Sequence, residues 1–173
     1  VEMVKNEELE IGLIEAELNE PTIEMEPFMS DELVLVARKG FFTMEQKHIG
    51  LEDLKSTPII LREKGSGTRT VINQCLEKSG LNPEELSVVL ELGSTESVKA
   101  AVEAGLGFSI LSKHSIRKEL SLEIFETYRI ENVELNRDFY MAYKKKRQLS
   151  LISELFIKLI KNSNNYLKNS ASI

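Results

Sequence analysis

The sequence has few of the residues that build crosslinks and metal centres. Its 173 residues include one cysteine, Cys75, which excludes an internal disulfide and a cysteine-rich metal ribbon. Its two histidines, His48 and His114, exclude most histidine-based zinc sites. No apolar run approaches the ~18 residues of a membrane span, so we expect no membrane contact. The chain starts at Val1 without an initiator Met, so we expect a processed protein or a piece of a longer one.

The composition is typical of a globular protein, but the charged residues are unevenly distributed along the chain. The net charge of −6 disfavours a polyanion such as DNA as the main partner of these residues. Residues 1–32 carry eleven acids and one base, whereas residues 137–173 carry eight bases and two acids. We expect the two ends to lie in one subdomain and neutralise each other. The basic run Lys144–Arg147 lacks interleaved aromatics, and we interpret it as a solvated turn rather than a DNA contact.

The middle of the chain predicts alternating strands and helices. Strands are expected at Pro58–Arg62, Ser87–Leu92 and Phe108–Leu111, with helices at Thr68–Ser79 and from Ser94 or Thr95 to Gly105. Short loops between such elements require a parallel sheet with right-handed crossovers. The sequence therefore predicts a parallel βαβαβ block over residues 58–112.

The two ends of the chain predict a second α/β block. Strands are expected at Glu10–Ala16, Ile23–Phe28, Leu33–Ala37 and Asp138–Lys144, and a closing helix at Ser150–Lys161. We expect Asp138–Lys144 to pair with Glu10–Ala16 or its neighbours, away from the central block. The predicted subdomains are 1–40 with 128–161, and 41–127, with hinge connections near 38–57 and 120–130. Residues 162–173 are predicted to be a polar tail that frays.

Two loops follow strands of the central block where helices begin, which is where parallel sheets bind ligands. Backbone N–H groups, hydroxyls and a guanidinium there suit a carboxylate, sulfate or phosphate. The expected ligand-binding residues are Ser66, Gly67, Thr68, Arg69, Ser94 and Thr95, with Arg62 and Glu63 shaping the rim. Arg69 is expected to face water in the cleft. An ordinary strand–helix turn with a capping Ser and a surface Arg explains the same spacing equally well.

The sequence gives little support for a catalytic site. Cys75 falls on the apolar stripe of a predicted helix, which is typical of a structural thiol. His48 and His114 are interpreted as surface residues, and the acids around Glu15 as a solvated rim. The Walker A, dinucleotide-binding and Gly-x-Ser-x-Gly patterns do not occur. We therefore expect no catalysis, no metal and no cofactor.

Several segments together resemble a known family. They are LREKGSGTR (Leu61–Arg69), ELGSTESVKAAV (Glu91–Val102), EAGLGFSILS (Glu103–Ser112), EIGLIE (Glu10–Glu15), DELVLVAR (Asp31–Arg38) and Arg137–Lys144 with the last helix. This set resembles the effector-binding, or substrate-binding, domain of LysR-type transcriptional regulators across nearly all of residues 1–161. The GSGTR and GSTES forms are most similar to the branch that governs sulfur and carbon assimilation genes.

The resemblance implies an α/β fold of two Rossmann-like subdomains joined by a two-crossover hinge. This is the type II periplasmic-binding-protein-like architecture, here N-terminally truncated, because the family's opening strand, helix and strand are not matched. It implies a cytoplasmic homo-oligomer that senses a small anionic metabolite in an inter-subdomain cleft and contacts DNA only through a missing N-terminal domain. The missing elements predict exposed apolar surface at Val1–Lys5 and at Leu151, Leu155 and Leu159 of the last helix, and hence self-association.

Two other functions fit the same architecture. One is a solute-binding protein of a transport system, which a secretory signal upstream of Val1 would favour. The other is a lyase-type enzyme resembling prephenate dehydratase, which turnover by the purified protein would reveal.

Overall fold

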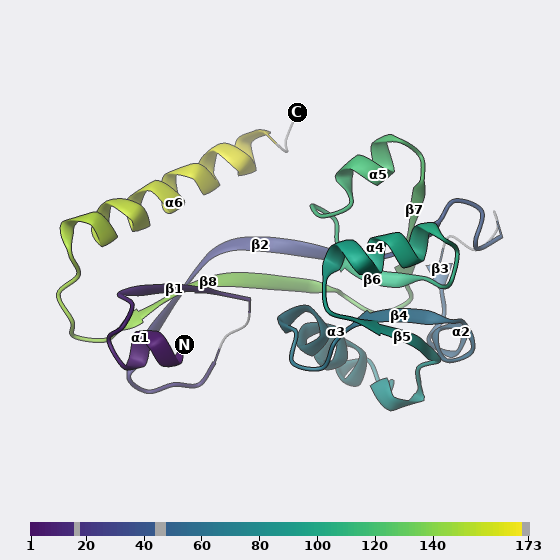
Figure 1. Ribbon diagram of the computed structural model, residues 1–173, viewed down its shortest axis with the longest axis horizontal. Helices are drawn as coiled ribbons and strands as arrows, with labels where there is room; N and C mark the ends of the chain where they lie inside the picture. The colour runs from purple at the N-terminus through teal and green to yellow at the C-terminus, as the bar shows by residue number, and fades with distance from the viewer. Residues whose placement is uncertain (16–17, 44–47, 171–173) are drawn as a thin grey trace. The chain divides into compact units, whose positions relative to one another are not determined.

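The computed structural model describes residues 1–15, 18–43 and 48–170 (Figure 1). The chain divides into two compact units, one made of residues 1–30 and 137–173 and the other of residues 31–136. We refer to them as the terminal unit and the central unit. Strands β2 (Ile23–Arg38) and β8 (Asn136–Lys144) contain the points at which the chain passes from one unit to the other.

The central unit contains the predicted βαβαβ block. Its strands are β4 (Ile59–Arg62), β5 (Val88–Leu92) and β6 (Ser109–Ser112), connected by helices α3 (Gly67–Lys78) and α4 (Thr95–Glu103). Strand β4 pairs in parallel with β5. A parallel bridge between Ile59 and Phe108, with a 2.8 Å bond from the Ile60 amide to the Phe108 carbonyl, joins β4 to the start of β6. The prediction for residues 58–112 is confirmed.

Further strands extend this arrangement. The remaining elements of the central unit are β3 (His48–Ile49), α2 (Leu51–Ser56), the 3-10 turn η1 (Pro83–Glu85), α5 (Arg117–Ser121) and β7 (Phe125–Ile130). The second half of β2 pairs antiparallel with both β6 and β7, and β7 pairs in parallel with β3.

Strand β2 corrects one expectation. The sequence predicted two separate strands, Ile23–Phe28 and Leu33–Ala37, whereas the structure has one strand of 16 residues. The polar residues between them stay extended because neighbouring segments hold them. The Lys113 amide donates to the Glu32 carbonyl at 2.9 Å, and the Ser30 hydroxyl donates to Asp138 at 2.6 Å.

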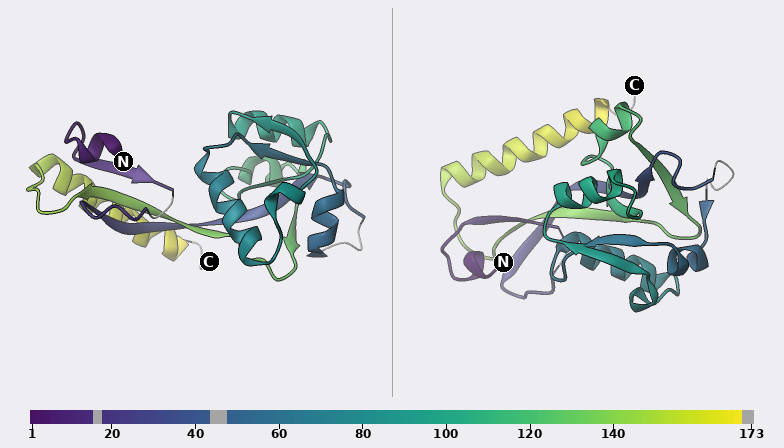
Figure 2. Two further views of the ribbon diagram at one scale, coloured as in Figure 1. Left: turned by 90° about the horizontal axis from the view of Figure 1, so that it is seen from below. Right: turned by 45° about the vertical axis from the view of Figure 1, so that its right-hand side comes forward.

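Alternating residues of β4 build the two faces of the central core. Ile59 and Leu61 pack in one buried cluster with Ile72 of α3, whereas Ile60 packs in a second cluster with Val98 of α4. This period of two is what a strand covered on both faces requires. Figures 1 and 2 show α3 and α4 on opposite sides of β4. The result is the helix–sheet–helix layering of a Rossmann-like block.

Glycines end both long helices of the central unit. Gly80 and Gly105 have positive φ values of 88° and 77°. The Leu81 amide bonds to the Leu76 carbonyl, and the Gly80 amide bonds to the Glu77 carbonyl, which is the Schellman arrangement. The opposite ends of these helices follow the carboxyl ends of β4 and β5 in the chain.

In the terminal unit the two ends of the chain pair. Strand β1 (Ile11–Ile14) runs antiparallel to β8, with Ile11 opposite Tyr143, so the predicted pairing of Asp138–Lys144 is confirmed. The expected separation from the central block is not, because β8 neighbours β2, and β2 also pairs with β6 in one six-stranded sheet. The acidic and basic ends neutralise each other, as predicted. Their ion pairs are Lys144 with Glu7, Arg137 with Glu15 at 2.8 Å, Arg147 with Glu10 at 3.9 Å and Lys161 with Glu26 at 2.7 Å.

The terminal unit also holds helices α1 (Glu2–Lys5) and α6 (Leu151–Ser170). Helix α6 continues nine residues past the predicted end at Lys161, which corrects the expectation of a frayed tail from residue 162; no Pro or Gly among residues 162–170 interrupts it. The expected exposure of the apolar face is confirmed, with Leu151 70%, Leu155 54% and Leu159 63% exposed. Near the start of the chain, Met3 is exposed but Val4 is buried.

Candidate functional site

The two predicted loops meet in the central unit because β4 and β5 end side by side. Arg62 and Leu92, the last residues of these strands, are register partners. The Glu63 amide donates to the Leu92 carbonyl at 3.1 Å, which carries the contact beyond the strand ends. Helix α3 then begins at Gly67 and α4 at Thr95. The structure therefore brings the eight predicted residues to one edge of the sheet.

Arg62 connects the two loops directly. Its Nε and Nη2 atoms each donate a 2.8 Å hydrogen bond to a carboxylate oxygen of Glu63, and its Nη1 donates to the Thr95 hydroxyl oxygen at 3.2 Å. The bonds from Arg62 lower the pKa of Glu63 to about 2, so this carboxylate is ionised at neutral pH. Arg62 and Glu63 therefore form a neutral ion pair, and the bond from Arg62 to Thr95 connects this pair to α4.

Arg69 does not face water, and the sequence-based expectation is wrong on this point. The residue is 6% exposed. Its Nη1 donates to the Arg62 carbonyl at 3.3 Å, its Nε donates to Asn73 at 3.2 Å, and Glu91 lies 3.5 Å away. The physical reason is helical spacing: Arg69 lies three residues before the buried Ile72, on the same face of α3. Its side chain therefore runs inward beside β4.

The first turn of α3 presents backbone donors. Ser66 occupies the N-cap position and is buried, but its side chain makes no capping hydrogen bond. The Thr70 amide makes the first helical bond, to the Ser66 carbonyl. The amides of Gly67 and Arg69 have no acceptor among the described residues. Buried Thr68 lies between them and adds a hydroxyl to this turn.

The start of α4 is built differently. The Ser94 hydroxyl accepts a 3.1 Å bond from the Ser97 amide, so this side chain caps its own helix. Within the described part of the chain, the amides of Thr95 and Glu96 have no acceptor. The positive ends of two helix dipoles thus lie at neighbouring strand ends, and both expose unused donors.

The acids near these donors are neutralised. Glu63 is paired with Arg62, Glu91 with Arg69 at 3.5 Å, and Glu96 with Lys99 at 3.1 Å. Lys99 also holds Glu119 of α5 at 2.8 Å, which ties α4 to the helix that follows it. Because the carboxylates have cationic partners, the helix dipoles and amides determine the local potential. This arrangement suits an oxyanion.

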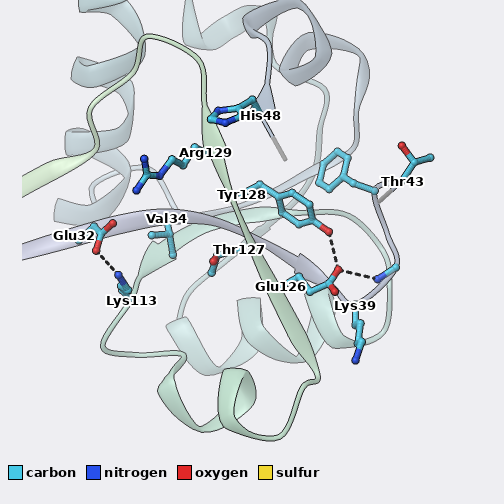
Figure 3. Close-up of a pocket in the computed structure, with 12 residues that line it drawn as sticks. Glu32, Val34, Lys39, Thr43, His48, Lys113, Glu126, Thr127, Tyr128 and Arg129 are labelled. Atoms are coloured by element: carbon cyan, nitrogen blue, oxygen red, sulfur yellow. Dashed lines mark hydrogen bonds and ion pairs between the residues drawn. The ribbon is translucent and has the colours of Figure 1, made fainter. Parts of the chain in front are cut away.

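The structure also has a cavity of about 750 Å³ that the sequence did not predict (Figure 3). It lies around β7, where the Tyr128 hydroxyl donates to Glu126 at 2.9 Å and Glu32 pairs with Lys113 at 2.7 Å. Burial and the Glu126 carboxylate raise the pKa of Tyr128 to about 12. His48 and Thr43, which line one side, adjoin residues 44–47, which lie outside the described residues. None of the eight predicted residues lines this cavity, and we assign it no function.

Neither a metal-binding cluster nor a membrane-spanning helix is found among the described residues. Across 1–15, 18–43 and 48–170, no group of three or more His, Cys, Asp or Glu side chains is arranged to hold a metal ion. The same residues contain no helix both long and apolar enough to span a membrane. Cys75 packs half-buried against the core of α3, and this burial raises the pKa of its thiol.

Comparison with known proteins decides the family. The LysR substrate binding domain family matches residues 1–165. This chain belongs to that family. It is 33% identical to the HTH-type transcriptional regulator CysL of Bacillus subtilis over 162 residues, which is 94% of this chain and 53% of CysL. It is also 33% identical to the transcriptional activator CmpR of Synechocystis over 135 residues, which is 78% of this chain and 43% of CmpR. The LysR domain thus spans about half the length of these curated relatives.

Solved structures agree with the LysR assignment. The regulatory domain of Synechocystis CcmR, solved in complex with 2-PG, superposes with a TM-score of 0.82 at 28% identity, covering 94% of this chain and 77% of that one. The effector-binding domain of QuiR, solved with shikimate, has a TM-score of 0.78 at 22% identity, covering 95% and 76%, and supports the fold alone. The periplasmic-binding-protein-like fold is confirmed. The chain is a LysR-type effector-binding domain, not an enzyme, and the transport and lyase alternatives are set aside.

Proposed function

We propose that this LysR domain binds a small anionic metabolite of carboxylate, sulfate or phosphate type at the starts of α3 and α4. The observation that carries the proposal is the pair of adjacent helix starts whose four amides, at Gly67, Arg69, Thr95 and Glu96, lack acceptors among the described residues. Such donors at positive helix ends bind oxyanions without a counter-ion. The CcmR relative, solved with 2-PG, supports this ligand class.

The predicted site residues take two kinds of role in this proposal. Ser66, Gly67, Thr68 and Thr95 contact the anion through hydroxyls and amides, and Arg69 contributes its amide. The second group holds the donors in place and consists of the Arg69 guanidinium, the Arg62–Glu63 pair and the Ser94 cap.

The regulatory role of the whole protein rests on the family. We take the terminal and central units to be the family's two subdomains, with β2 and β8 as the connections between them. A metabolite that binds one conformation of the domain more tightly than another shifts the population toward it. In a homo-oligomer in the cytoplasm, this shift would be transmitted to DNA through a part of the protein outside this chain.

Amide chemical shifts test the site directly. Titrating ¹⁵N-labelled protein with 2-phosphoglycolate and with sulfate should move the amide signals of Gly67, Arg69, Thr95 and Glu96. Replacing Thr95 with Val should weaken binding by about tenfold, as expected for one lost hydrogen bond to an anion. The matched control is Thr127→Val, because Thr127 is exposed on β7 of the same unit. Anions that shift only signals elsewhere in the protein would refute the proposal.

A further inference from the structure

We infer that Arg62 is a positioning residue: it turns the Thr95 hydroxyl hydrogen away from itself, so that Thr95 donates to an oxyanion bound at the start of α4. This inference rests on the proposed function and adds a positioning residue to it. It comes from the direction of the hydrogen bonds around Thr95.

The first step concerns the hydroxyl hydrogen of Thr95. A guanidinium can only donate hydrogen bonds, so in the 3.2 Å contact Arg62 Nη1 donates and Thr95 Oγ1 accepts. The hydroxyl hydrogen must then point away from Arg62. Thr95 donates this hydrogen to no acceptor within the described part of the chain. The hydrogen is therefore available to a ligand at the start of α4.

The second step concerns how rigidly Arg62 is held. Glu63 engages the guanidinium through two bonds of 2.8 Å, and this bidentate geometry fixes its plane as well as its position. The Arg62 carbonyl is held from α3 by Arg69, and the next amide, that of Glu63, is held from β5 by Leu92. The backbone that carries Arg62 is therefore fixed by both neighbours. The direction of the Thr95 hydroxyl hydrogen is set before a ligand binds.

The third step concerns charge. Both Glu63 oxygens accept bonds from Arg62, so this carboxylate is neutralised next to Thr95. An oxyanion bound at the start of α4 therefore meets the oriented Thr95 hydroxyl hydrogen without an uncompensated carboxylate beside it.

A double-mutant cycle measures the Arg62–Thr95 coupling. The probes are sulfate and 2-phosphoglycolate, and affinity is read from the amide shifts of Thr95 and Glu96. We expect Arg62→Gln to weaken binding of both probes by about tenfold in the parent chain. In a Thr95→Val background the same change should have almost no effect, because the hydroxyl it orients is gone. Arg62→Lys keeps the positive charge but loses the bidentate pairing with Glu63, and it should weaken binding as Arg62→Gln does.

The outcomes separate the inference from the proposed function. If neither probe shifts the four amides in the parent chain, the proposed function fails and the inference fails with it. If the probes bind but Arg62→Gln weakens binding equally in the parent chain and in the Thr95→Val background, Arg62 acts through its charge, and only the inference fails. Should Arg62→Gln not fold, as judged by circular dichroism, Arg62→Lys carries the same cycle.

Discussion

The guanidinium nitrogen Nη1 of Arg69 lies 3.3 Å from the carbonyl oxygen of Arg62, and this bond ties the first turn of α3 to the end of β4. Both residues come from the loop expected to bind an anion. The structure gives the Arg69 side chain a supporting role instead, because it is buried and bonded to protein groups. Loss of the Arg69 side chain should therefore be detected as a loss of stability.

Arg69→Ala should destabilise the protein. It removes the hydrogen bonds from a buried guanidinium to the Arg62 carbonyl and to Asn73, at a cost of about 1–3 kcal/mol. The 3.5 Å ion pair with the half-exposed Glu91 adds little. Urea unfolding followed by circular dichroism measures the change. The matched control, Lys64→Ala in the same loop, is exposed and should be neutral; an equally neutral Arg69→Ala would contradict the supporting role.

Gly107→Ala should also destabilise the protein, for a steric reason. A Cβ at Gly107 would lie 2.5 Å from the Pro58 carbonyl oxygen, closer than packed atoms approach. Relief requires moving the strand start at Pro58 away from Phe108, whose amide bonds to that same carbonyl. The expected loss is about 1–3 kcal/mol in the free energy of unfolding. At Gly93 an added Cβ meets nothing within 4 Å, so Gly93→Ala in a parallel urea experiment should leave the midpoint almost unchanged.

The central fold could be predicted from the sequence because its signals are local. Gly80 and Gly105 end helices, and β4 and β6 are short apolar strands bounded by turns. The continuity of β2 could not be predicted in this way. Its polar stretch is held extended by partners such as Lys113 and Asp138, which lie far away in the sequence. The extension of α6 past Lys161 could not be predicted from propensity either, because residues 162–170 are rich in Asn and Ser, which are weak helix formers.

The sequence predicted that the two loops would meet at one edge of the sheet, but not how their side chains bond to each other. Strand order and helix starts were enough to bring Ser66 and Thr95 to one edge. The direction of Arg69 was missed because the loop pattern outweighed its three-residue spacing from Ile72. The bond between Arg62 and Thr95 depends on the register of β4 against β5, which a single sequence does not reveal.

Cys75→Ala should lower stability by about 1 kcal/mol and leave anion binding unchanged. The thiol packs half-buried against the core cluster of α3, so its loss removes apolar contact. Because burial raises its pKa, the thiol should also react slowly with a thiol reagent at pH 7.5. Urea unfolding and a timed thiol assay check both parts. A thiol that reacts as fast in the folded protein as in urea would contradict the packing.

Acid should weaken the Arg62–Glu63 pair only at low pH. The folded-state pKa of Glu63 is lowered to about 2 by its bonds to Arg62, against an ordinary value of 4.5. A lowered carboxyl pKa gives stability that is fully present above pH 4.5 and is lost as the pH falls toward 2. The stability difference between the parent chain and Glu63→Gln should therefore be constant from pH 8 to pH 5 and shrink below pH 4.5. Urea midpoints measured across this range test it, and a difference that shrinks already near pH 7 would contradict the assignment.

Exposed apolar residues on α6 should make this chain self-associate. Ile152 is 80% and Leu151 70% exposed, and Leu155 and Leu159 follow on the same helix. A contiguous stripe of this kind gains free energy when two copies cover it. Sedimentation velocity should show an average mass that rises with concentration for the parent chain. Leu155→Glu combined with Leu159→Lys leaves the net charge unchanged and should abolish this rise.

The control for this prediction is Leu122→Glu. Leu122 is 58% exposed but lies in the central unit, away from α6 in the sequence. This change introduces a charge at a similarly exposed leucine, so it should leave the concentration dependence in place if α6 is the contact. A parent chain that sediments as a monomer at every concentration would contradict the prediction. Equal effects of Leu122→Glu and the α6 double variant would show that association is a general consequence of exposed leucines rather than a property of this helix.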